Sequence, residues 1–456
     1  MEAIVVIAGI AAAVWGGIVF LRGGLTAGAL LVLLAGTCFS VPFYKVELGS
    51  LPLTADRAML VLLVLQYVLW RRMGRLDPKP IGKPEIILLA LVGLLLGSTF
   101  THDWRAANYQ PVAWLIVNYL MPVAMYWMMR QARWTEREVL AVFGGFALFG
   151  VYLALTSLAE YFQLGGLVFP SYITTSAMDS SAEFVGRARG PLLHPIGNGI
   201  LLAICLGCVL LWWPRLRRAG QLGILAVAML LLTAIYFSLT RSVWMGGAFA
   251  VGLAVSLALP WSWRWPMLGI GVLAATIVLA TQWDNIVAFK RDKALGAEKT
   301  ADSVALRPIL ATIAWKMFLD RPLLGCGYAQ YGTEHLQYTS DRSTSLPLER
   351  GRGYIPHNVA FALLTEMGIV GLGLFVTLLS LWARDAWRLW RETRLPLWAR
   401  QQGLLLLIVL GVYLINGMFH EVSVIPMANM TLFFLAGVTA GLRPLLTRLP
   451  GSAIPG

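Results

Sequence analysis

Residues 353–375 read GYIPHNVAFALLTEMGIVGLGLF and mark the point at which a long polar segment gives way to a long apolar helix. His357 and Asn358 stand at this boundary, so a membrane-spanning helix that begins here places both side chains at a membrane surface. Histidine changes its charge near neutral pH and serves as a general base. The position alone suits a catalytic histidine and equally an interfacial histidine that caps a helix, and the rest of the sequence separates the two.

The composition is that of a protein with many membrane-spanning helices. Hydrophobic residues form 58% of the 456 positions and charged residues 13%, whereas soluble domains carry about 25% charged residues. Apolar runs of about 20 residues cross a bilayer as helices. Such runs, or shorter ones, lie near residues 3–21, 25–42, 57–71, 84–100, 111–129, 138–162, 192–213, 221–239, 242–260, 265–282, 357–382, 401–419 and 424–442. The sequence therefore predicts an all-α, polytopic transmembrane bundle of about 12 or 13 spans.

The loops between these runs carry lysine and arginine unevenly. Basic residues crowd the loops after the third, fifth, seventh and eleventh runs, and also the C-terminal end. All of these loops share one side if the helices alternate in direction, and the positive-inside rule makes that side the cytoplasm. The C-terminus is then cytoplasmic, and two polar segments, 163–191 and 283–356, lie on the outer side.

This pattern divides the chain into three regions. Residues 1–162 form N-terminal transmembrane helices, 163–382 form a core with the large outer loop 283–356, and 383–456 hold a basic loop and the last two helices. In the large loop, apolar residues recur on one face of a helix that Pro322 ends. They are Leu306, Ile309, Leu310, Ile313, Met317 and Phe318. We expect an amphipathic helix that lies on the outer leaflet or over a cavity.

The outer side carries more cations than the positive-inside rule predicts. The candidate binding residues there are Arg187, Arg189, His194, Arg241, Arg307 and Arg321. Arginine offers a phosphate two parallel N–H groups and stays protonated in proteins, so a phosphate-bearing lipid is the natural partner. Arg241 is the strongest candidate for a phosphate contact at the membrane boundary, because only a short polar break separates the two apolar runs beside it. The alternative for Arg241 is a contact with ordinary phospholipid head groups.

Glu366 and three glycines lie inside the apolar run that follows His357. At 1.5 Å per residue, Glu366 stands about 13 Å along a straight helix from His357, within the hydrocarbon. A carboxyl group at that depth faces the interior or pairs with a partner. A structural hydrogen bond is favoured over a role as proton acceptor, because substrate reaches that depth poorly. Gly368, Gly371 and Gly373 allow a neighbouring helix to approach closely.

Other chemistries leave no motif in the sequence. It contains no metal-ligand cluster, no phosphate-binding glycine loop and no Gly-x-Ser-x-Gly elbow. Much of the net charge of +13 belongs to the cytoplasmic loops, so nucleic acid is not the expected partner. We therefore expect catalysis without a metal or another cofactor, by arginine, histidine and carboxylate groups on a substrate that is already activated.

Four short motifs follow one another on the outer side. They are Arg189-Gly190-Pro191 with His194-Pro195, Thr240-Arg241-Ser242-Val243-Trp244, Asp320-Arg321-Pro322-Leu323-Leu324-Gly325-Cys326-Gly327, and His357-Asn358 with Glu366-Met367-Gly368-Ile369-Val370-Gly371-Leu372. Through these motifs and their order, residues 180–380 resemble the O-antigen ligase and O-antigen polymerase superfamily of bacterial inner-membrane proteins. That family usually has about twelve spans, which leaves the N-terminal half of the chain less well matched.

The resemblance implies a membrane-embedded glycosyltransferase that needs no metal. Such an enzyme takes a glycan from an undecaprenyl-pyrophosphate carrier and passes it to an acceptor hydroxyl. The acceptor is lipid A–core in ligases and another carrier-linked glycan in polymerases, so the product is lipopolysaccharide or another surface polysaccharide. The implied location is the bacterial inner membrane, with the large loop and the active site on the periplasmic side.

The arginines have a defined use in this chemistry. Negative charge builds up on the pyrophosphate as it leaves, and arginines already in position stabilise that charge in a site of low dielectric. Arg189 and Arg241 are the predicted catalytic arginines, and Arg187 and Arg307 are weaker candidates for binding the same group.

The acceptor hydroxyl needs a base, and His357 is the predicted one. Asn358 either orients His357 or binds a sugar hydroxyl, and His194 and Arg321 are further predicted substrate-binding residues. Three tyrosines of the outer loop either stack on sugars or anchor the loop at the membrane interface. They are Tyr328, Tyr331 and Tyr354.

Two other classes of protein fit parts of the pattern. A lipid or sugar transporter would show repeated halves and polar groups near mid-membrane, whereas here Glu366 stands nearly alone at depth and the polar residues gather on one side. A scaffold protein would tolerate loss of the outer arginines and of His357. The choice between a ligase and an O-antigen or exopolysaccharide polymerase stays open, because no short motif reports the acceptor.

Overall fold

The computed structural model confirms an all-α, polytopic fold. It describes residues 22–43, 52–103, 110–175, 186–258 and 297–447, together with isolated positions between these ranges. In this part of the chain, nine helices are long and apolar enough to cross a membrane. They are α4 (Lys83–Thr101), the continuous α5 to α6 (Pro111–Gln131), α7 (Glu136–Tyr161), α9 (Pro195–Leu211), α10 (Arg218–Phe237), α11 (Arg241–Ala258), α15 (Val359–Arg391), α16 (Leu397–Gly417) and α17 (Pro426–Leu442).

The helices that meet this requirement are fewer than the expected 12 or 13 spans. Two more expected runs form helices, α2 (Gly24–Cys38) and α3 (Ala55–Arg72), but α2 has only 15 residues and α3 carries charges at both ends. The runs expected near 3–21 and 265–282 lie outside the continuously described ranges. Every expected run within those ranges is therefore helical, and nine have the length and hydropathy of a span.

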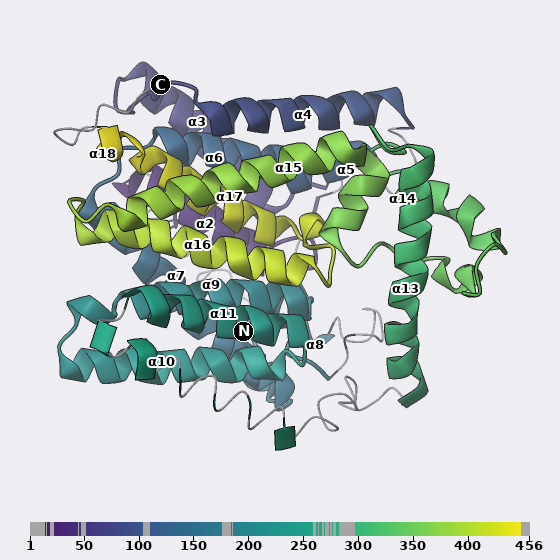
Figure 1. Ribbon diagram of the computed structural model, residues 1–456. Coiled ribbons are helices and arrows are strands. Elements are labelled where there is room, and N and C mark those ends of the chain that lie inside the picture. Colours follow the sequence, from purple (N-terminus) through teal and green to yellow (C-terminus); the bar gives the residue numbers. More distant parts are fainter. Residues whose placement is uncertain are drawn as a thin grey trace.

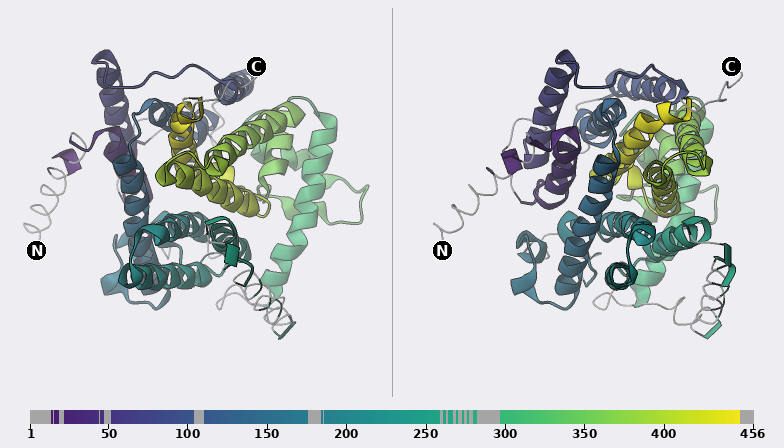
Figure 2. Two further views of the ribbon diagram at one scale, coloured as in Figure 1. Left: turned by 60° about the vertical axis from the view of Figure 1, so that its left-hand side comes forward. Right: turned by 90° about the vertical axis from the view of Figure 1, so that its left-hand side faces the viewer.

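The membrane-spanning helices lie side by side, and α13 (Ala297–Asp320) crosses one end of the bundle (Figure 1). α8 (Tyr172–Thr175) and α14 (Tyr331–Glu334) lie at this same end, which we call the cavity end. α18 (Pro444–Thr447) lies at the opposite end, which we call the basic end. When the basic end faces the viewer, α13 stands behind the other helices (Figure 2, right).

The amphipathic helix expected in the large loop is confirmed as α13. Its buried residues include Leu306, Ile309, Leu310, Ile313 and Met317. This face packs on Tyr331 and Leu348, which belong to the polar segment that follows the helix. The helix ends at Asp320, two residues before Pro322. Of the two expected positions for this helix, the one over a cavity is the one observed, because Leu306 lines the cavity described below.

Two helices form the centre of the bundle. Every residue of α17 from Met427 to Leu442 is buried, and in α9 every residue except Leu210 is buried. α17 packs against α6 and α2, and α9 packs against α7 and α11. A side chain at Gly199 of α9 would overlap Val243 of α11, so the two backbones lie unusually close. Since α10 returns between them, α9 and α11 run in the same direction and both begin at the cavity end (Figure 1).

The expected gathering of basic loops on one side is confirmed at the basic end. Lys79 donates from Nζ to the carbonyl oxygen of Arg130 at 2.9 Å, which joins the loop after α3 to the end of α6. Arg215, after α9, donates to the side chain of Gln401 in α16 and lies 3.8 Å from Glu136 at the start of α7. Loops that are distant in the sequence therefore share one end of the bundle.

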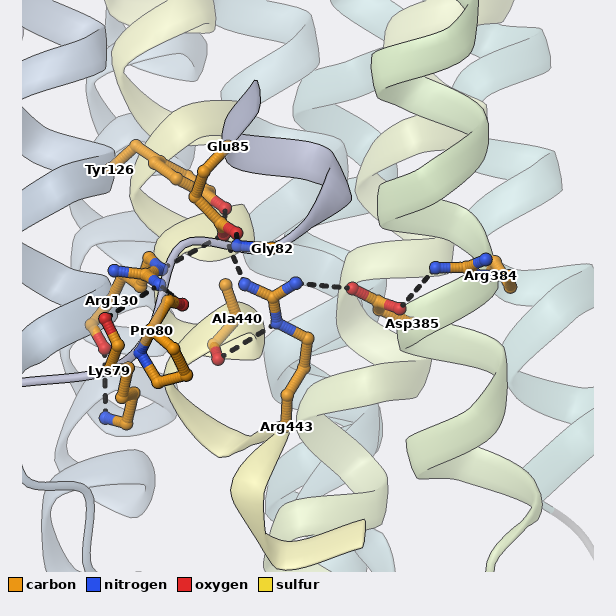
Figure 3. Close-up of polar contacts among 10 residues, drawn as sticks. All are labelled: Lys79, Pro80, Gly82, Glu85, Tyr126, Arg130, Arg384, Asp385, Ala440 and Arg443. Carbon is orange, nitrogen blue, oxygen red and sulfur yellow. Dashed lines mark hydrogen bonds and ion pairs between the residues drawn. The ribbon is translucent and has the colours of Figure 1, made fainter. Parts of the chain in front are cut away.

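A cluster of buried charges ties this end together (Figure 3). The Glu85 carboxylate accepts a hydrogen bond from the hydroxyl of Tyr126 at 2.6 Å and lies 3.0 Å from Nε of Arg130. Arg443 also pairs with Glu85 and reaches Asp385 of α15 at 3.4 Å. Because buried charges are costly unless paired, the cluster holds α4, α6, α15 and the end of α17 in one arrangement.

α15 is not continuous, which corrects the straight helix expected from the sequence. Gly368 has φ 63° and ψ −166°, values outside the helical region, and divides α15 into two parts. A turn of the large loop lies against this break. The N–H of Cys326 donates to the carbonyl oxygen of Thr365, and the N–H of Ile369 donates to that of Pro322, each at 2.8 Å. Two motifs recognised separately in the sequence therefore dock through their backbones.

Glu366 lies just before the break and has partners in the docked polar segment. Its carboxyl group accepts hydrogen bonds from the N–H groups of Ala329 and Tyr331, which is the kind of contact that the favoured structural role predicts. A side chain at Gly368 would overlap the carbonyl group of Leu323, so the docked turn requires glycine there. The hydrophobic pattern conceals the break because the residues on both sides of it are apolar.

The other two glycines of α15 differ from each other. A side chain at Gly371 would overlap Met367, which lies on the far side of the break. Gly373 has open space around it, because no atom of the described residues outside its own stretch of helix lies within 4 Å of an added Cβ. The expected close approach of a helix is therefore wrong for Gly373, and at Gly368 the close neighbour is a loop instead of a helix.

Candidate functional site

A cavity of about 1060 Å³ lies at the cavity end of the bundle. Its wall includes His194, Arg307 and His357, three residues that the sequence marked as candidates. They stand at the start of α9, in α13 and just before α15. The fold brings them together because α9 and α15 both begin at this end and α13 crosses it (Figure 1).

Four helices begin at the wall of this cavity. The wall residues at these starts are Thr54 for α3, His194 for α9, His357 for α15 and Pro426 for α17. The first turn of a helix leaves backbone N–H groups unpaired and carries a partial positive charge. Such ends bind phosphate and other anions, so the backbone and the arginine side chains favour the same kind of ligand here.

Asn358 fixes the position of His357. The Asn358 side chain caps α15, with Oδ1 accepting from the N–H groups of Ala360 at 2.8 Å and Phe361 at 3.1 Å. Its Nδ2 donates to the carbonyl oxygen of Met418 at 2.9 Å, which joins the start of α15 to the end of α16. Both ends of the amide have protein partners, which favours the orienting role over a contact with a sugar hydroxyl. The half-buried His357 itself lines the cavity.

His194 has a different environment from His357. It caps α9 itself, with Nδ1 accepting from the N–H of Gly197 at 3.2 Å. Burial, and next the nearby charge of Arg187, lower the pKa of His194 to about 4. The ring is therefore neutral at pH 7, and because Nδ1 is an acceptor, the proton resides on Nε2. The Nε2–H of His194 can donate a hydrogen bond to a substrate. Its Nδ1, the atom that would accept a proton, already accepts from the N–H of Gly197.

Arg307 and Arg241 bring two positive charges to the cavity end. Arg307 lines the cavity, and its guanidinium carbon lies 5.6 Å from the ring centre of Phe419. Burial lowers the pKa of Arg307, and the charge of Arg241 lowers it further, so the two positive charges act on each other. Arginine nevertheless stays protonated in proteins. Two neighbouring cations, one on α11 and one on α13, suit a ligand with more than one negative charge.

Arg187 lies behind the wall. Its side chain is 1% exposed, and the guanidinium carbon lies 5.6 Å from the ring centre of Phe184, a wall residue. The charge of Arg187 also acts on His194. The structure therefore brings Arg187 close to the cavity, where its positive charge adds to that of Arg307.

Two other predicted arginines make internal ion pairs. Arg189 is buried, and its Nε lies 2.9 Å from the carboxylate of Glu160, which also accepts from the N–H of Gly190 at 2.7 Å. Arg321 pairs with Glu334 at 3.1 Å near the end of α13. Within the described ranges, neither arginine lines the cavity. Arg189 instead clamps the loop before α9 to α7, and direct contact of either residue with a substrate stays a prediction.

The sequence assigned no role to several wall residues. Asp56 and Arg57 begin α3, and His420 and Glu421 lie between α16 and α17. The signal for all four is a short polar group at the outer end of an apolar run. Burial, and next the neighbouring Glu366, raise the pKa of Glu421, which shifts it towards its neutral form and reduces its repulsion of an anion.

The tyrosines separate into two groups. Tyr328 and Tyr331 are buried, so their rings serve packing within the loop. Tyr354 is 42% exposed and lines the cavity, so its ring is the one available to stack on a sugar. In the described part of the chain, no three His, Cys, Asp or Glu side chains gather as a metal site.

The fold and the cavity define a polytopic membrane protein with a cavity, lined in part by arginine and histidine, at one end of its helices. Residues 225–376 match a protein-family model described as O-antigen ligase. This segment contains Arg241, Arg307 and His357, and it runs from α10 to beyond the break in α15. Over these residues the match supports the resemblance to the O-antigen ligase and polymerase superfamily. No curated protein matches the chain.

Proposed function

We propose that the protein transfers a glycan from an undecaprenyl-pyrophosphate carrier to an acceptor hydroxyl, as an O-antigen ligase does. It would act in the bacterial inner membrane with the cavity end towards the periplasm. The observation that carries the proposal is the cavity itself, because its wall unites His357, Arg307 and four helix starts, and the charge of Arg241 acts on Arg307. Those are the parts that a displacement with a pyrophosphate leaving group needs.

The reaction is a single displacement at the anomeric carbon of the glycan. The oxygen of the acceptor forms a bond to that carbon while the bond from carbon to the pyrophosphate oxygen breaks, so the anomeric configuration inverts. His357 takes the proton of the acceptor hydroxyl. Arg307, Arg241 and the helix starts stabilise the charge that develops on the departing pyrophosphate.

The support differs between the residues proposed for this reaction. His357 and Arg307 line the cavity, and Arg241 lies near Arg307. His194, neutral and with an N–H to donate, suits a sugar or phosphate oxygen. We assign Arg189 a supporting role, because its ion pair with Glu160 holds the loop that carries His194.

The competing transporter hypothesis has less support. A transport site is expected near the middle of the membrane between repeated halves, whereas this cavity is lined by the starts of helices at one end of the bundle. The position of the cavity at one end of the bundle suits a reaction at a membrane surface. A polymerase of the same superfamily shares these features, and the acceptor separates it from a ligase.

The test uses purified protein in nanodiscs with an undecaprenyl-pyrophosphate-linked oligosaccharide. One sample contains a lipid A–core acceptor and the other contains none, and the products are separated on a gel. Transfer that depends on the acceptor supports a ligase. A ladder of longer carrier-linked chains without the acceptor supports the polymerase, and movement of the lipid between leaflets with neither product contradicts both and supports a transporter.

A further inference from the structure

The wall of the cavity includes a cation that lies far outside the segment matched to the O-antigen ligase family. Arg57 is in the first turn of α3, whereas the matched segment covers residues 225–376. Arg57 nevertheless shares the cavity with His357 and Arg307. The N-terminal helices therefore contribute a charged side chain to the same space as the proposed catalytic base.

The start of α3 holds Arg57 in a defined place. Thr54 donates from Oγ1 to Oδ1 of Asp56 at 2.6 Å, and Nη1 of Arg57 donates to the carbonyl oxygen of Pro52. A side chain at Gly36 would overlap Met427 and press on Asp56, so α2, α3 and α17 meet closely here. Arg57 is thus anchored by local hydrogen bonds and by packing.

The guanidinium group of Arg57 has binding capacity that its protein contacts do not use. Its Nε is buried and has no hydrogen-bond partner among the described residues. Within the same ranges, Arg57 forms no ion pair with a carboxylate, although Asp56 is its sequence neighbour. A half-buried cation with an unpaired N–H is costly unless an anion supplies the missing partner, and arginine matches phosphate oxygens in particular.

We propose that Arg57 binds a phosphate group of a substrate, on the part of the cavity wall formed by α2, α3 and α17. This inference rests on the proposed function and extends it to the N-terminal helices. Two sources supply the same chemistry, namely the pyrophosphate of the lipid carrier and a phosphate on a glycolipid acceptor. The carrier and the acceptor are distinguished by the experiment.

The experiment measures the binding of three probes to the full-length protein in nanodiscs. The probes are undecaprenyl pyrophosphate, a phosphorylated lipid A–core acceptor, and the same acceptor after enzymatic dephosphorylation. Arg57→Gln removes the charge, and Arg57→Lys keeps it without the two parallel N–H groups. Arg72→Gln is the matched control, because Arg72 is an exposed arginine at the opposite end of the same helix.

We expect Arg57→Gln to weaken the binding of one phosphate-bearing probe about tenfold or more, Arg57→Lys to weaken it less, and Arg72→Gln to leave it unchanged. A loss for undecaprenyl pyrophosphate assigns Arg57 to the carrier. A loss for the phosphorylated acceptor, absent with the dephosphorylated one, assigns it to the acceptor.

Binding of both phosphate probes within twofold of wild type by an Arg57→Gln protein of unchanged melting temperature would overturn the inference. So would a wild-type protein that binds neither probe. If Arg57→Gln fails to fold, Arg57→Lys decides by the same comparison. Wild-type protein that binds a probe through Arg57 but transfers no glycan would reject the proposed function and leave the phosphate site in place.

Discussion

At the scale of single residues, the two wall histidines differ because of the way each helix start is capped. Asn358 caps α15, so the ring of His357 is not used for that purpose. At α9 the cap is His194 itself, whose Nδ1 accepts from the N–H of Gly197, while burial and next the charge of Arg187 lower its pKa and favour the neutral ring. The same residue type therefore serves as the proposed base at one helix start and as a hydrogen-bond donor at the other.

Removal of the proposed base tests the role of His357. His357→Ala is expected to reduce glycan transfer by about 100-fold or more, because a positioned general base contributes about that much. Arg241→Ala is expected to abolish transfer as well, because it removes a charge that faces the leaving pyrophosphate. The measurement is product formed per amount of inserted protein. Wild-type activity at equal membrane level contradicts the role of the residue that was changed.

The lowered pKa of His194 predicts how stability depends on pH. The pKa is about 4 in the folded protein and 6.5 without the fold, so the unfolded chain binds the proton more readily. The contribution of neutral His194 to the free energy of unfolding is complete above about pH 6.5. It is lost as the pH falls towards 4, by at most ~1.4 kcal/mol per pH unit. The melting temperature of the wild type should therefore fall between pH 7 and pH 5.

The matched variant for this test is His194→Asn, which keeps a capping side chain but does not titrate. Its melting temperature should fall less than that of the wild type over the same range of pH. An equal fall in both proteins would show that His194 is not the group responsible.

At the scale of secondary-structure elements, the break in α15 positions the end of that helix that follows His357, the proposed base. The first part of α15 carries His357 at its start and turns away from the longer second part near the cavity end (Figure 1). The turn 322–327 docks into the break through backbone hydrogen bonds. These bonds join the large loop to the first part of α15, and Arg307 and His357 line the same cavity.

Substitution of the glycine at the break tests this arrangement. Gly368→Ala places a side chain on the carbonyl group of Leu323 and forces a non-glycine residue to φ 63°. The strain at positive φ alone costs about 1–3 kcal/mol, so the melting temperature should fall and transfer should decrease with it. Gly373→Ala is the control, because Gly373 lies in the same helix with open space around it. The same loss in both variants would contradict a specific role of the break.

At the scale of the whole molecule, the two ends of the bundle differ in their use of charge. At the basic end, arginine is paired with buried carboxylates, as between Arg130 and Glu85 (Figure 3). At the cavity end Arg189 is also paired, with Glu160, but Arg57 and Arg307 face a shared space beside four helix starts. Paired charges hold helices together, whereas cations that face a cavity suit an anionic substrate. The proposed orientation places the basic end in the cytoplasm.

Single-cysteine labelling tests this orientation. The four native cysteines are buried, so a membrane-impermeant maleimide should react with them poorly. Tyr354→Cys at the cavity end should be labelled in intact spheroplasts, and Arg72→Cys at the basic end only after the membrane is permeabilised. The reverse pattern would place the cavity on the cytoplasmic side and would contradict the proposed access of a periplasmic acceptor.

The sequence by itself determined the helical class, the helix positions within the described ranges and the basic end. Each of these depends on local properties. The hydropathy of one segment decides whether it spans a membrane, and the charge of one loop biases its side. The prediction that His357 is the base also came from a local property, namely its place where a polar segment meets an apolar run.

Only the tertiary structure decided which cations share a cavity. Arg57 and Arg307 line it, whereas Arg189 is paired with Glu160 and Arg321 with Glu334. The partner of a charged group depends on the packing of segments that are far apart in the chain, and hydrophobic periodicity carries no information about that packing. The break at Gly368 was hidden for the same reason, because its non-helical backbone is stabilised by hydrogen bonds to a distant turn.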